Sequence, residues 1–325
     1  MGKNSVKKRL NKIDKLNVQV PLKQAIEGFI MFKKAGGISE RTESDYKKYF
    51  KMFFTDSDLN TMCFPEFEEL KAEILKHFSK YADKAPATYN LHFAYLSSFF
   101  SWCTLEGYIP QNPIKEIGLK KRKDEIKLRH LETDTIKKLF SIMDIKTFSG
   151  YRDYAITVLT MDTGIRPKEI FSLHKDDIDL LHGNLTIPRD ISKTRTTRVL
   201  PISMQTIVVI KKLISITPSD WGERLFYTCE GMQMSAETWG KRLTYYGGKL
   251  KHKITPYMLR HSFAIGYLKN GGNVFALQKE LGHVDITMTR RYINISDNDL
   301  KEQHISASPL NNFLQRTTRV QKLFK

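Results

Sequence analysis

Four short stretches of the sequence carry side chains of the kinds that bind and cleave a phosphodiester. The stretches are "TGIRPKEI", "ISKTRTTR", "YMLRHS" and "LGHVDITMTRRY", and the side chains are Arg166, Glu169, Lys193, Tyr257, Arg260, His261, His283 and Tyr292. Each alone has an ordinary structural explanation: an arginine can pair with a glutamate three residues later on a helix, and a histidine after a glycine can simply follow a helix end. Only the order and spacing of the whole set indicate that these side chains form one site.

The set occurs in a recognisable order. An arginine in "TGIR" is followed by a lysine in a turn between strands, by "LRH", by "LGH" and by a tyrosine nine residues later. This arrangement resembles the tyrosine recombinase family, which includes phage integrases and Xer/Cre-like recombinases. A second stretch, "TYNLHFAYLSSFFSWCTLEGYIPQNPI", is similar to the end of that family's N-terminal core-binding domain. The resemblance covers roughly residues 20 to 300.

The resemblance implies that Tyr292 attacks a DNA phosphate, and the residue chemistry agrees. Rejoining a strand without external energy needs a covalent intermediate, and a phenolate is a reasonable leaving group. Arg166 and Arg260 can clamp the non-bridging oxygens, where negative charge builds. Lys193 on a turn can protonate the departing 5′ oxygen, and His283 can donate a hydrogen bond to the phosphate. We expect Glu169 to orient Arg166, and the scheme requires no metal or other cofactor.

One position departs from the family pattern. The residue three before the second arginine is most often histidine in the family and is Tyr257 here. A tyrosine has a reference pKa of about 10 and is therefore a poor proton acceptor at neutral pH. His283 or water would then assist Tyr292. One step along a helix turns a side chain by roughly 100°. We therefore expect His261 to point away from the face shared by Tyr257 and Arg260 and to be structural.

The composition favours a nucleic-acid partner. The 325 residues include 53 Lys+Arg and 35 Asp+Glu, for a formal charge of +18, and basic side chains bind polyanions by releasing condensed counterions. A generally basic proteome or an anionic membrane surface is the alternative. Three widely spaced cysteines, Cys63, Cys103 and Cys229, argue against a disulfide framework and a zinc cluster. The sequence has no membrane-length apolar run or signal peptide, so we expect a cytoplasmic, nucleoid-associated protein.

Hydrophobic periodicity predicts two domains. Residues 1–118 are expected to form an all-α N-terminal core-binding domain, because aromatic residues recur there at helical spacing. We expect these aromatic side chains to form its core, Ser39 to cap one helix, and another helix to run from Thr88 to about Glu106. Residues 130–304 are expected to form an α+β, mainly helical catalytic domain, with a helix capped by Thr133 and a small antiparallel sheet from "DDIDLLHGNLTIP" and "TRVLPI". Residues 119–129 then form a basic linker, either solvated or lying along DNA. The side chains predicted to contact DNA phosphates are Lys120, Lys121, Arg122, Lys123 and Arg195.

Residues 305–325 form a predicted C-terminal tail. Leu310, Phe313 and Leu314 recur there at helical spacing, and so few apolar residues need a groove to dock into, on their own domain or on a neighbour. The resemblance implies docking into a neighbouring protomer, within a homotetramer on two DNA duplexes that carry specific sites. Free in solution, we expect a monomer or a weak dimer.

We therefore predict a site-specific DNA recombinase that acts through a covalent 3′-phosphotyrosyl intermediate and a Holliday junction, for a mobile element. A Xer-type resolvase of chromosome or plasmid dimers is the alternative, and a type IB topoisomerase is chemically similar. The complete set of site residues argues against a DNA-binding regulator without catalysis. A metal-dependent nuclease would need clustered acids, and its candidates, Asp176, Asp177 and Asp179, lie beside a predicted hairpin and read as turn residues.

Overall fold

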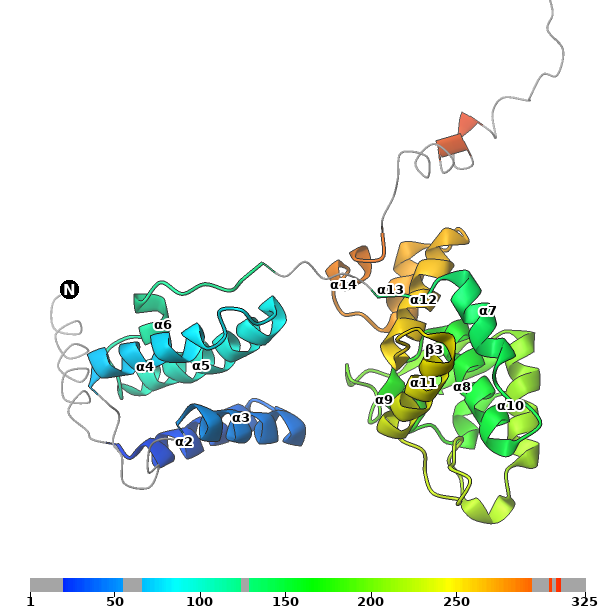
Figure 1. Ribbon diagram of the computed structural model, residues 1–325, viewed down its shortest axis with the longest axis horizontal. Coiled ribbons are helices and arrows are strands. Elements are labelled where there is room, and N and C mark those ends of the chain that lie inside the picture. The colour runs from blue at the N-terminus through cyan, green and yellow to red at the C-terminus, as the bar shows by residue number, and fades with distance from the viewer. Residues whose placement is uncertain (1–19, 55–65, 124–128, 294–303, 306–307, 311–325) are drawn as a thin grey trace, which may run out of the picture. The chain divides into compact units, whose positions relative to one another are not determined.

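The computed structural model describes residues 20–54, 66–123, 129–293, 304–305 and 308–310. The chain divides into two compact units, Met1–Ile126 and Lys127–Lys325, and each is described by itself (Figure 1). This division falls inside the predicted basic linker. The narrower boundaries at residues 118 and 130 remain predictions.

The first unit is a helical bundle around aromatic side chains. Its named helices are α2 Leu22–Ala35, α3 Glu40–Phe53, α4 Phe67–Ser79, α5 Pro86–Glu106 and α6 Pro113–Glu116. Phe29 lies at the centre, fully buried, and its ring meets four others edge-on at centroid distances of 5.2 to 5.8 Å: Tyr46, Phe50, Phe99 and Trp102. Such edge-to-face pairs add to the stabilisation from apolar burial. The expected aromatic core of this unit is confirmed.

The helix ends of this unit follow local signals in the sequence. The hydroxyl of Ser39 accepts a hydrogen bond from the backbone N–H of Thr42 at 3.2 Å and so caps α3, as predicted. Helix α5 begins at Pro86 rather than at the predicted Thr88, since a proline fits the first turn, where its missing N–H costs nothing. It ends at Gly107, whose φ of 79° suits glycine.

Arg122 has a structural role that the sequence did not reveal. The side chain of Asn90 accepts a hydrogen bond from the backbone N–H of Arg122 and donates one to its carbonyl, at 2.8 and 2.9 Å. The Arg122 guanidinium donates to the carbonyls of Tyr81 and Ala82 and lies 3.9 Å from the Tyr89 ring centroid. The start of the linker is therefore fixed to the bundle. The prediction of DNA contacts in the linker now rests on three exposed lysines, Lys120, Lys121 and Lys123.

The second unit is mainly helical with one small sheet. Its helices are α7 Thr133–Ser141, α8 Phe148–Thr163, α9 Pro167–Ile170, α10 Met204–Ile216, α11 Ala236–Leu250, α12 Pro256–Lys269, α13 Val274–Leu281 and α14 Thr287–Arg290, with 3₁₀ turns at Lys175–Asp177 and Ser219–Trp221. Strands β1 Ile178–Asp179, β2 Asn184–Ile187 and β3 Arg198–Pro201 form an antiparallel sheet in the order β1-β2-β3. The predicted fold class, an all-α domain followed by an α+β, mainly helical domain, is confirmed.

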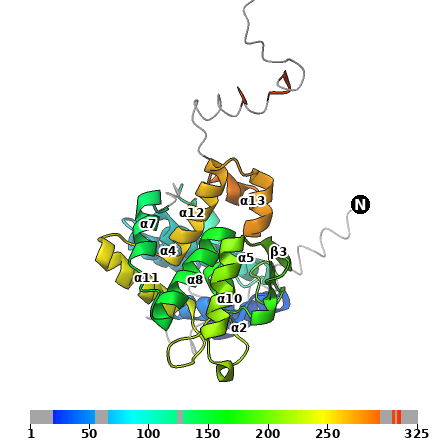
Figure 2. The same ribbon diagram turned by 90° about the vertical axis from the view of Figure 1, so that its right-hand side faces the viewer.

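Helix α8 is the centre of this unit. It packs against α10 and α12, and Figure 2 shows α7, α10, α11 and α12 around it. Ala155, Ile156 and Leu159 are fully buried, and they join a core to which the sheet contributes Leu185 and Leu200. Because α8 is held on several sides, the turn after its last residue has a fixed position. The first candidate arginine lies in that turn.

Other sequence expectations for this unit have clear outcomes. Thr133 is the first residue of α7 rather than its N-cap, which is Glu132, a difference within the usual uncertainty of a helix end. The acidic residues beside the hairpin serve local turns: Asp177 accepts from the His174 N–H, and Asp179 from the N–H groups of Leu181 and His182. The interpretation of Asp177 and Asp179 as turn residues is confirmed. In the predicted tail, Leu310 is exposed, while Phe313 and Leu314 lie outside the described residues.

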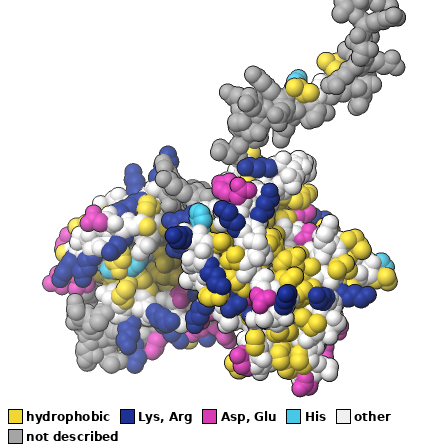
Figure 3. All heavy atoms as spheres, turned by 45° about the vertical axis from the view of Figure 1, so that its right-hand side comes forward, with side chains coloured by type: hydrophobic (Ala, Val, Ile, Leu, Met, Phe, Trp, Pro, Cys, Tyr) yellow, Lys and Arg dark blue, Asp and Glu magenta, His cyan; other side chains and the backbone are white. Residues whose placement is uncertain are grey.

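The surface carries basic and apolar side chains together. Figure 3 shows lysine and arginine side chains spread over one face among apolar groups. Within the described ranges, no helix has the length and apolar character needed to cross a membrane.

Candidate active site

The first arginine is positioned by two glycines. Helix α8 ends at Gly164, with a φ of 59°, and a Cβ at this position would lie 2.3 Å from the Phe263 ring. The chain therefore turns sharply before Arg166, which caps α9. The Arg166 Nη2 donates a 2.7 Å hydrogen bond to the carbonyl of Gly282, where φ is 61° at the end of α13. These contacts hold the guanidinium between two helix ends that lie far apart in the sequence.

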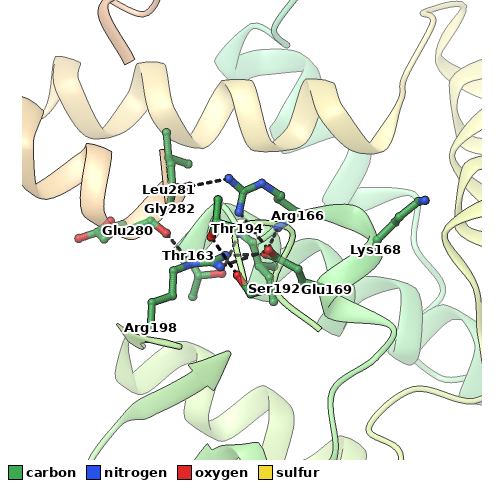
Figure 4. A network of polar contacts seen from close by, with 12 residues as sticks. Thr163, Arg166, Lys168, Glu169, Ser192, Thr194, Arg198, Glu280, Leu281 and Gly282 are labelled. Atoms are coloured by element: carbon green, nitrogen blue, oxygen red, sulfur yellow. Dashed lines mark hydrogen bonds and ion pairs between the residues drawn. The ribbon is translucent and has the colours of Figure 1, made fainter. Parts of the chain in front are cut away.

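Glu169 is shared by two arginines. Its carboxylate accepts from Arg166 Nη1 at 3.0 Å, and also from Arg198 at 3.2 and 2.5 Å through Nη1 and Nη2. Figure 4 shows both guanidinium groups converging on this carboxylate, while Lys168 points away from it. Burial alone would raise the pKa of Glu169, but Arg198 and Arg166 outweigh it and the pKa is lowered. The carboxylate therefore stays ionised and fixes both arginines.

Arg198 was not identified from the sequence, although it belongs to this network. It is the first residue of β3, and its Nε also donates to the Glu280 carbonyl at 3.2 Å. The sequence signal was an arginine at the start of the third strand, in "TTRVLPI". Periodicity shows only that this residue lies on a strand, since pairing with Glu169 depends on how the sheet packs against α9.

The second arginine is almost completely buried. Arg260 lies in the second turn of α12, and its guanidinium donates to the carbonyls of Gly164 at 2.5 Å and Leu281 at 2.8 Å. Burial, together with the neighbouring charge of Arg166, lowers the pKa of Arg260 to about 9. The group is still a cation at neutral pH. Arg260 thus donates to carbonyls at the ends of α8 and α13, and Arg166 donates to Gly282, the residue after Leu281. An anion bound between the two arginines would meet two guanidinium groups that are already held in place.

His283 joins the same site. Its Nε2 lies 3.2 Å from Arg260 Nη2, and its Nδ1 lies 2.9 Å from the Thr289 hydroxyl. Burial is the main cause that lowers the pKa of His283 to about 3, and Arg260 and Arg166 act in the same direction. The ring is therefore neutral at neutral pH.

Tyr292 lies against this group. Its side chain is 6% exposed and packs with Phe263, Leu277 and Leu281. The Tyr292 and His283 rings are nearly parallel, with centroids 6.4 Å apart. Burial raises the pKa of Tyr292, although Arg260, Arg291 and Arg166 oppose the rise. The phenol is thus protonated at neutral pH and must lose a proton before it can attack phosphorus.

The expectation for His261 was wrong. Its Nδ1 forms a 2.8 Å hydrogen bond with the Tyr292 hydroxyl, so it contacts the candidate nucleophile. Residues four apart on a helix are neighbours, and the Tyr257 and His261 ring centroids are 6.5 Å apart. His261 therefore shares a side of α12 with Tyr257 instead of opposing it. Tyr257 itself is 55% exposed.

Within the described residues, no hydrogen bond or ion pair joins Lys193 to this network, and Arg195 lies in the same loop. Both side chains are exposed in the loop between β2 and β3. The loop is anchored by Ser192, which is buried and whose N–H donates to the Pro188 carbonyl at 3.1 Å. Arg195 adopts a φ of 53°, unusual for a residue other than glycine. The predicted roles of both residues remain predictions.

Comparison with known proteins identifies the family of this chain. Residues 129–299 match the Phage integrase family. "Tyrosine recombinase XerD" of Listeria monocytogenes is 26% identical over 295 residues, which cover 87% of this chain and 98% of that protein. The XerD of Oceanobacillus iheyensis is 28% identical over 301 residues, which cover 89% and 99% of the two chains.

Two solved structures have the same fold. The integrase of the Tn1549 transposon, in complex with a circular intermediate DNA, gives a TM-score of 0.70 at 18% identity and covers 88% of this chain and 99% of its own. A lambda integrase dimer bound to a COC′ core site gives a TM-score of 0.66 at 19% identity, with coverage of 84% and 77%. The chain therefore belongs to the phage integrase family, and it is a tyrosine recombinase, an enzyme of site-specific DNA recombination.

Proposed function

We propose that this recombinase cuts and rejoins double-stranded DNA at specific sites, through a covalent 3′-phosphotyrosyl intermediate and a Holliday junction, in the service of a mobile element. The convergence of two arginines, a histidine and a buried tyrosine carries this proposal. Arg260 contacts the carbonyls at the ends of α8 and α13 and lies 3.2 Å from His283, against which Tyr292 packs. Those groups form an anion site with a nucleophile beside it.

Each site residue has a proposed role in strand cleavage. The Tyr292 phenol attacks the scissile phosphorus and releases a 5′ hydroxyl. Arg166 and Arg260 bind the non-bridging oxygens and stabilise the negative charge that develops on them. His283 donates a hydrogen bond to the same phosphate, which requires its ring to leave its present contact with Arg260. Glu169 positions Arg166 and Arg198 through the ion pairs described above.

Lys193 is the proposed general acid for the departing 5′ oxygen. Its loop is anchored at Ser192 and leads to Arg198, which pairs with Glu169 beside Arg166, while the lysine itself is exposed. The proposal requires the lysine side chain to reach a phosphate bound between the arginines. Replacing Lys193 should slow cleavage most on an ordinary 5′ oxygen leaving group. A 5′ sulfur, which leaves without a proton, should remove most of the defect.

The main test is covalent capture. Purified protein is incubated with fragmented host and element DNA, denatured with SDS, and the attached fragments are sequenced. Fragments that share one site at an element boundary would support the mobile-element role. A single chromosomal site outside any element would favour the Xer-type alternative, and attachment without sequence preference would favour a topoisomerase-like activity. The absence of any adduct would refute the proposed chemistry.

We also propose that four subunits assemble on two duplexes, with the tail at residues 305–325 docked into a neighbouring protomer. The exposed Leu310 supports a docking role, because a short segment with few apolar side chains cannot form a core of its own and needs a groove to dock into. Deleting residues 305–325 should leave binding to a single site intact and abolish complexes that contain two duplexes. Native gel mobility with two duplexes of different length measures this. Complete recombination by the truncated chain would refute the exchange.

A further inference from the structure

The Tyr292 phenol contacts a histidine that lies outside the expected catalytic set. The hydroxyl is 2.8 Å from His261 Nδ1, and the two ring centroids are 5.6 Å apart. A tyrosine that attacks phosphorus must give up its hydroxyl proton, and a group within hydrogen-bond distance can receive it. The candidates for the proton acceptor near this end of α12 are three side chains, those of His283, Tyr257 and His261.

His283 is excluded by its own hydrogen bonds. Arg260 Nη2 carries only donor hydrogens, so the His283 Nε2 atom that faces it at 3.2 Å must be the acceptor. The ring proton then lies on Nδ1, which faces the Thr289 hydroxyl at 2.9 Å. The lone pair of His283 is therefore already occupied by Arg260. A phosphate that displaced this contact would set an acceptor against Nε2, and His283 would donate to it once the ring proton moved from Nδ1 to Nε2. That proton leaves Nε2 without a lone pair for Tyr292.

Tyr257 is not placed to serve the phenol. Its side chain is more than half exposed, and a neutral tyrosine is a far weaker proton acceptor than a neutral imidazole. His261, one helical turn later on α12, lies between Tyr257 and Tyr292: the ring centroid distances are 6.5 and 5.6 Å. The residue at the family's usual histidine position is therefore separated from the nucleophile by another histidine.

We propose that His261 is the general base of this recombinase and takes the hydroxyl proton of Tyr292 on its Nδ1. This inference rests on the proposed role of Tyr292 as nucleophile. As the Tyr292 oxygen forms its bond to phosphorus, its proton passes to His261, the bond from phosphorus to the 5′ oxygen breaks, and that oxygen takes a proton from Lys193. Religation runs in reverse, with His261 returning the proton to the phenolate. The proposed step consumes no oxidant or reductant and uses no metal ion.

The charged surroundings of His261 fit a base that acts only on bound DNA. Burial, then Arg260, Arg291 and His130, lower the pKa of His261 to about 4, so the ring is neutral and its lone pair is available at neutral pH. The positive charges of Arg260 and Arg291 disfavour a protonated ring in the free protein. A scissile phosphate between the arginines would bring a compensating negative charge and make proton transfer easier. Proton uptake is thus coupled to the presence of substrate.

The deciding variants are His261→Asn and His261→Ala. The asparagine side-chain oxygen can accept a hydrogen bond from Tyr292 where Nδ1 does, but it cannot take the proton at neutral pH. On a nicked duplex that carries the captured site, we expect both variants to bind DNA normally. Both should form the covalent adduct at least about 100-fold more slowly in a single turnover. An asparagine variant within a few-fold of the wild-type rate would overturn the base assignment and leave His261 a positioning residue.

A more acidic phenol provides an independent readout. Fluorotyrosine at position 292 loses its proton more readily, so it should shrink the penalty of His261→Asn, and an undiminished penalty would also overturn the assignment. Without DNA, the fluorine NMR titration of this residue should differ between the wild-type and His261→Asn proteins, because the hydrogen-bond partner changes. No adduct from the wild-type protein would refute the proposed function and the base with it, whereas equal adduct rates in wild type and His261→Asn would refute the base alone.

Discussion

Two regions of this molecule contain the same pair of side chains, a buried tyrosine hydroxyl hydrogen-bonded to a histidine ring. In the helical unit, Tyr49 lies 3.0 Å from His77 Nε2, which in turn lies 3.0 Å from His92 Nδ1. In the catalytic unit, Tyr292 lies 2.8 Å from His261. Burial lowers the pKa of His77 and of His261 to about 4 in both places. A shifted histidine therefore does not by itself mark a reactive site.

The difference lies in what surrounds the tyrosine. Burial raises the pKa of Tyr49 well above its usual range, and the neighbouring hydroxyl of Tyr81 acts in the same direction. For Tyr292, three arginines oppose the effect of burial. A phenolate is therefore strongly disfavoured in the first unit and partly stabilised in the second. The neighbouring arginines are therefore what distinguishes the proposed catalytic pair, Tyr292 and His261, from the structural pair, Tyr49 and His77.

The largest contrast should come from removing each hydroxyl. Tyr292→Phe should bind DNA normally and form no covalent adduct, because the nucleophilic oxygen is gone. Tyr49→Phe should keep cleavage at the wild-type rate and lose about 1 kcal/mol of stability, the usual worth of one hydrogen bond. An SDS gel and a denaturant titration measure the two effects. An SDS-resistant band from the Tyr292→Phe protein would remove Tyr292 from the mechanism.

Removing Arg260 should make the surroundings of Tyr292 and His261 resemble those of Tyr49 and His77. Arg260→Ala should slow cleavage by on the order of 3 kcal/mol in the transition state, comparable to the loss of one oxyanion-hole donor. Since Arg260 is one cause of the lowered pKa of His261, the His261 pKa should rise toward its ordinary value. Nitrogen NMR of the histidine side chains follows that titration. An unchanged His261 pKa would mean that burial and the other neighbours, rather than Arg260, account for the shift.

Acid should destabilise the first unit, because its buried histidines, such as His77, take up protons more readily in the unfolded chain. A histidine whose folded pKa is about 4 takes up a proton in the unfolded chain near pH 6.5, well before it does so in the folded state. The unfolded state therefore binds more protons between these values, and the free energy of unfolding falls as the pH drops from about 6.5 toward 4. His77→Gln should reduce this fall by about 1 kcal/mol, a value discounted because the ring is only half-buried.

Hydrogen exchange at pH 7 and pH 5 measures this change segment by segment. The expected loss of protection in the wild-type protein lies in α3, α4 and α5, which carry Tyr49, His77 and His92. An identical pH dependence in His77→Gln would show that the cluster is not the acid-sensitive element.

The smallest effect is expected at Tyr257. Because its side chain is exposed and His261 already contacts the phenol, Tyr257→His should change the cleavage rate by only a few-fold, without loss. The pH profile of the cleavage rate should gain an ionisation at about pH 6.5, which is the reference pKa of an exposed histidine. A loss as severe as that of Arg260→Ala would give Tyr257 a specific role of its own.

Sequence reasoning was reliable where a feature depends on local pattern. Ser39 as a helix cap and Arg166 with Glu169 one turn later depend on neighbours in the chain, and both occur as expected. It was less reliable where distant segments meet. Arg198 reaches Glu169 from a strand, and Arg122 stacks on Tyr89 from the linker. For His261, the helical turn was known, but the side from which Tyr292 approaches α12 depends on the path of the chain after α13.

The carboxylate of Glu169 also sets the net charge of the arginine site. Three guanidinium groups, those of Arg166, Arg198 and Arg260, act on one another around this single carboxylate. These four side chains therefore carry an excess of two positive charges. An intact phosphodiester carries a single negative charge, and the pentacovalent state reached after attack by a deprotonated tyrosine carries a second. If these side chains bind the scissile phosphate as proposed, their net charge matches the transition state and exceeds that of the entering phosphodiester. Binding energy would then lower the reaction barrier rather than only strengthen DNA binding.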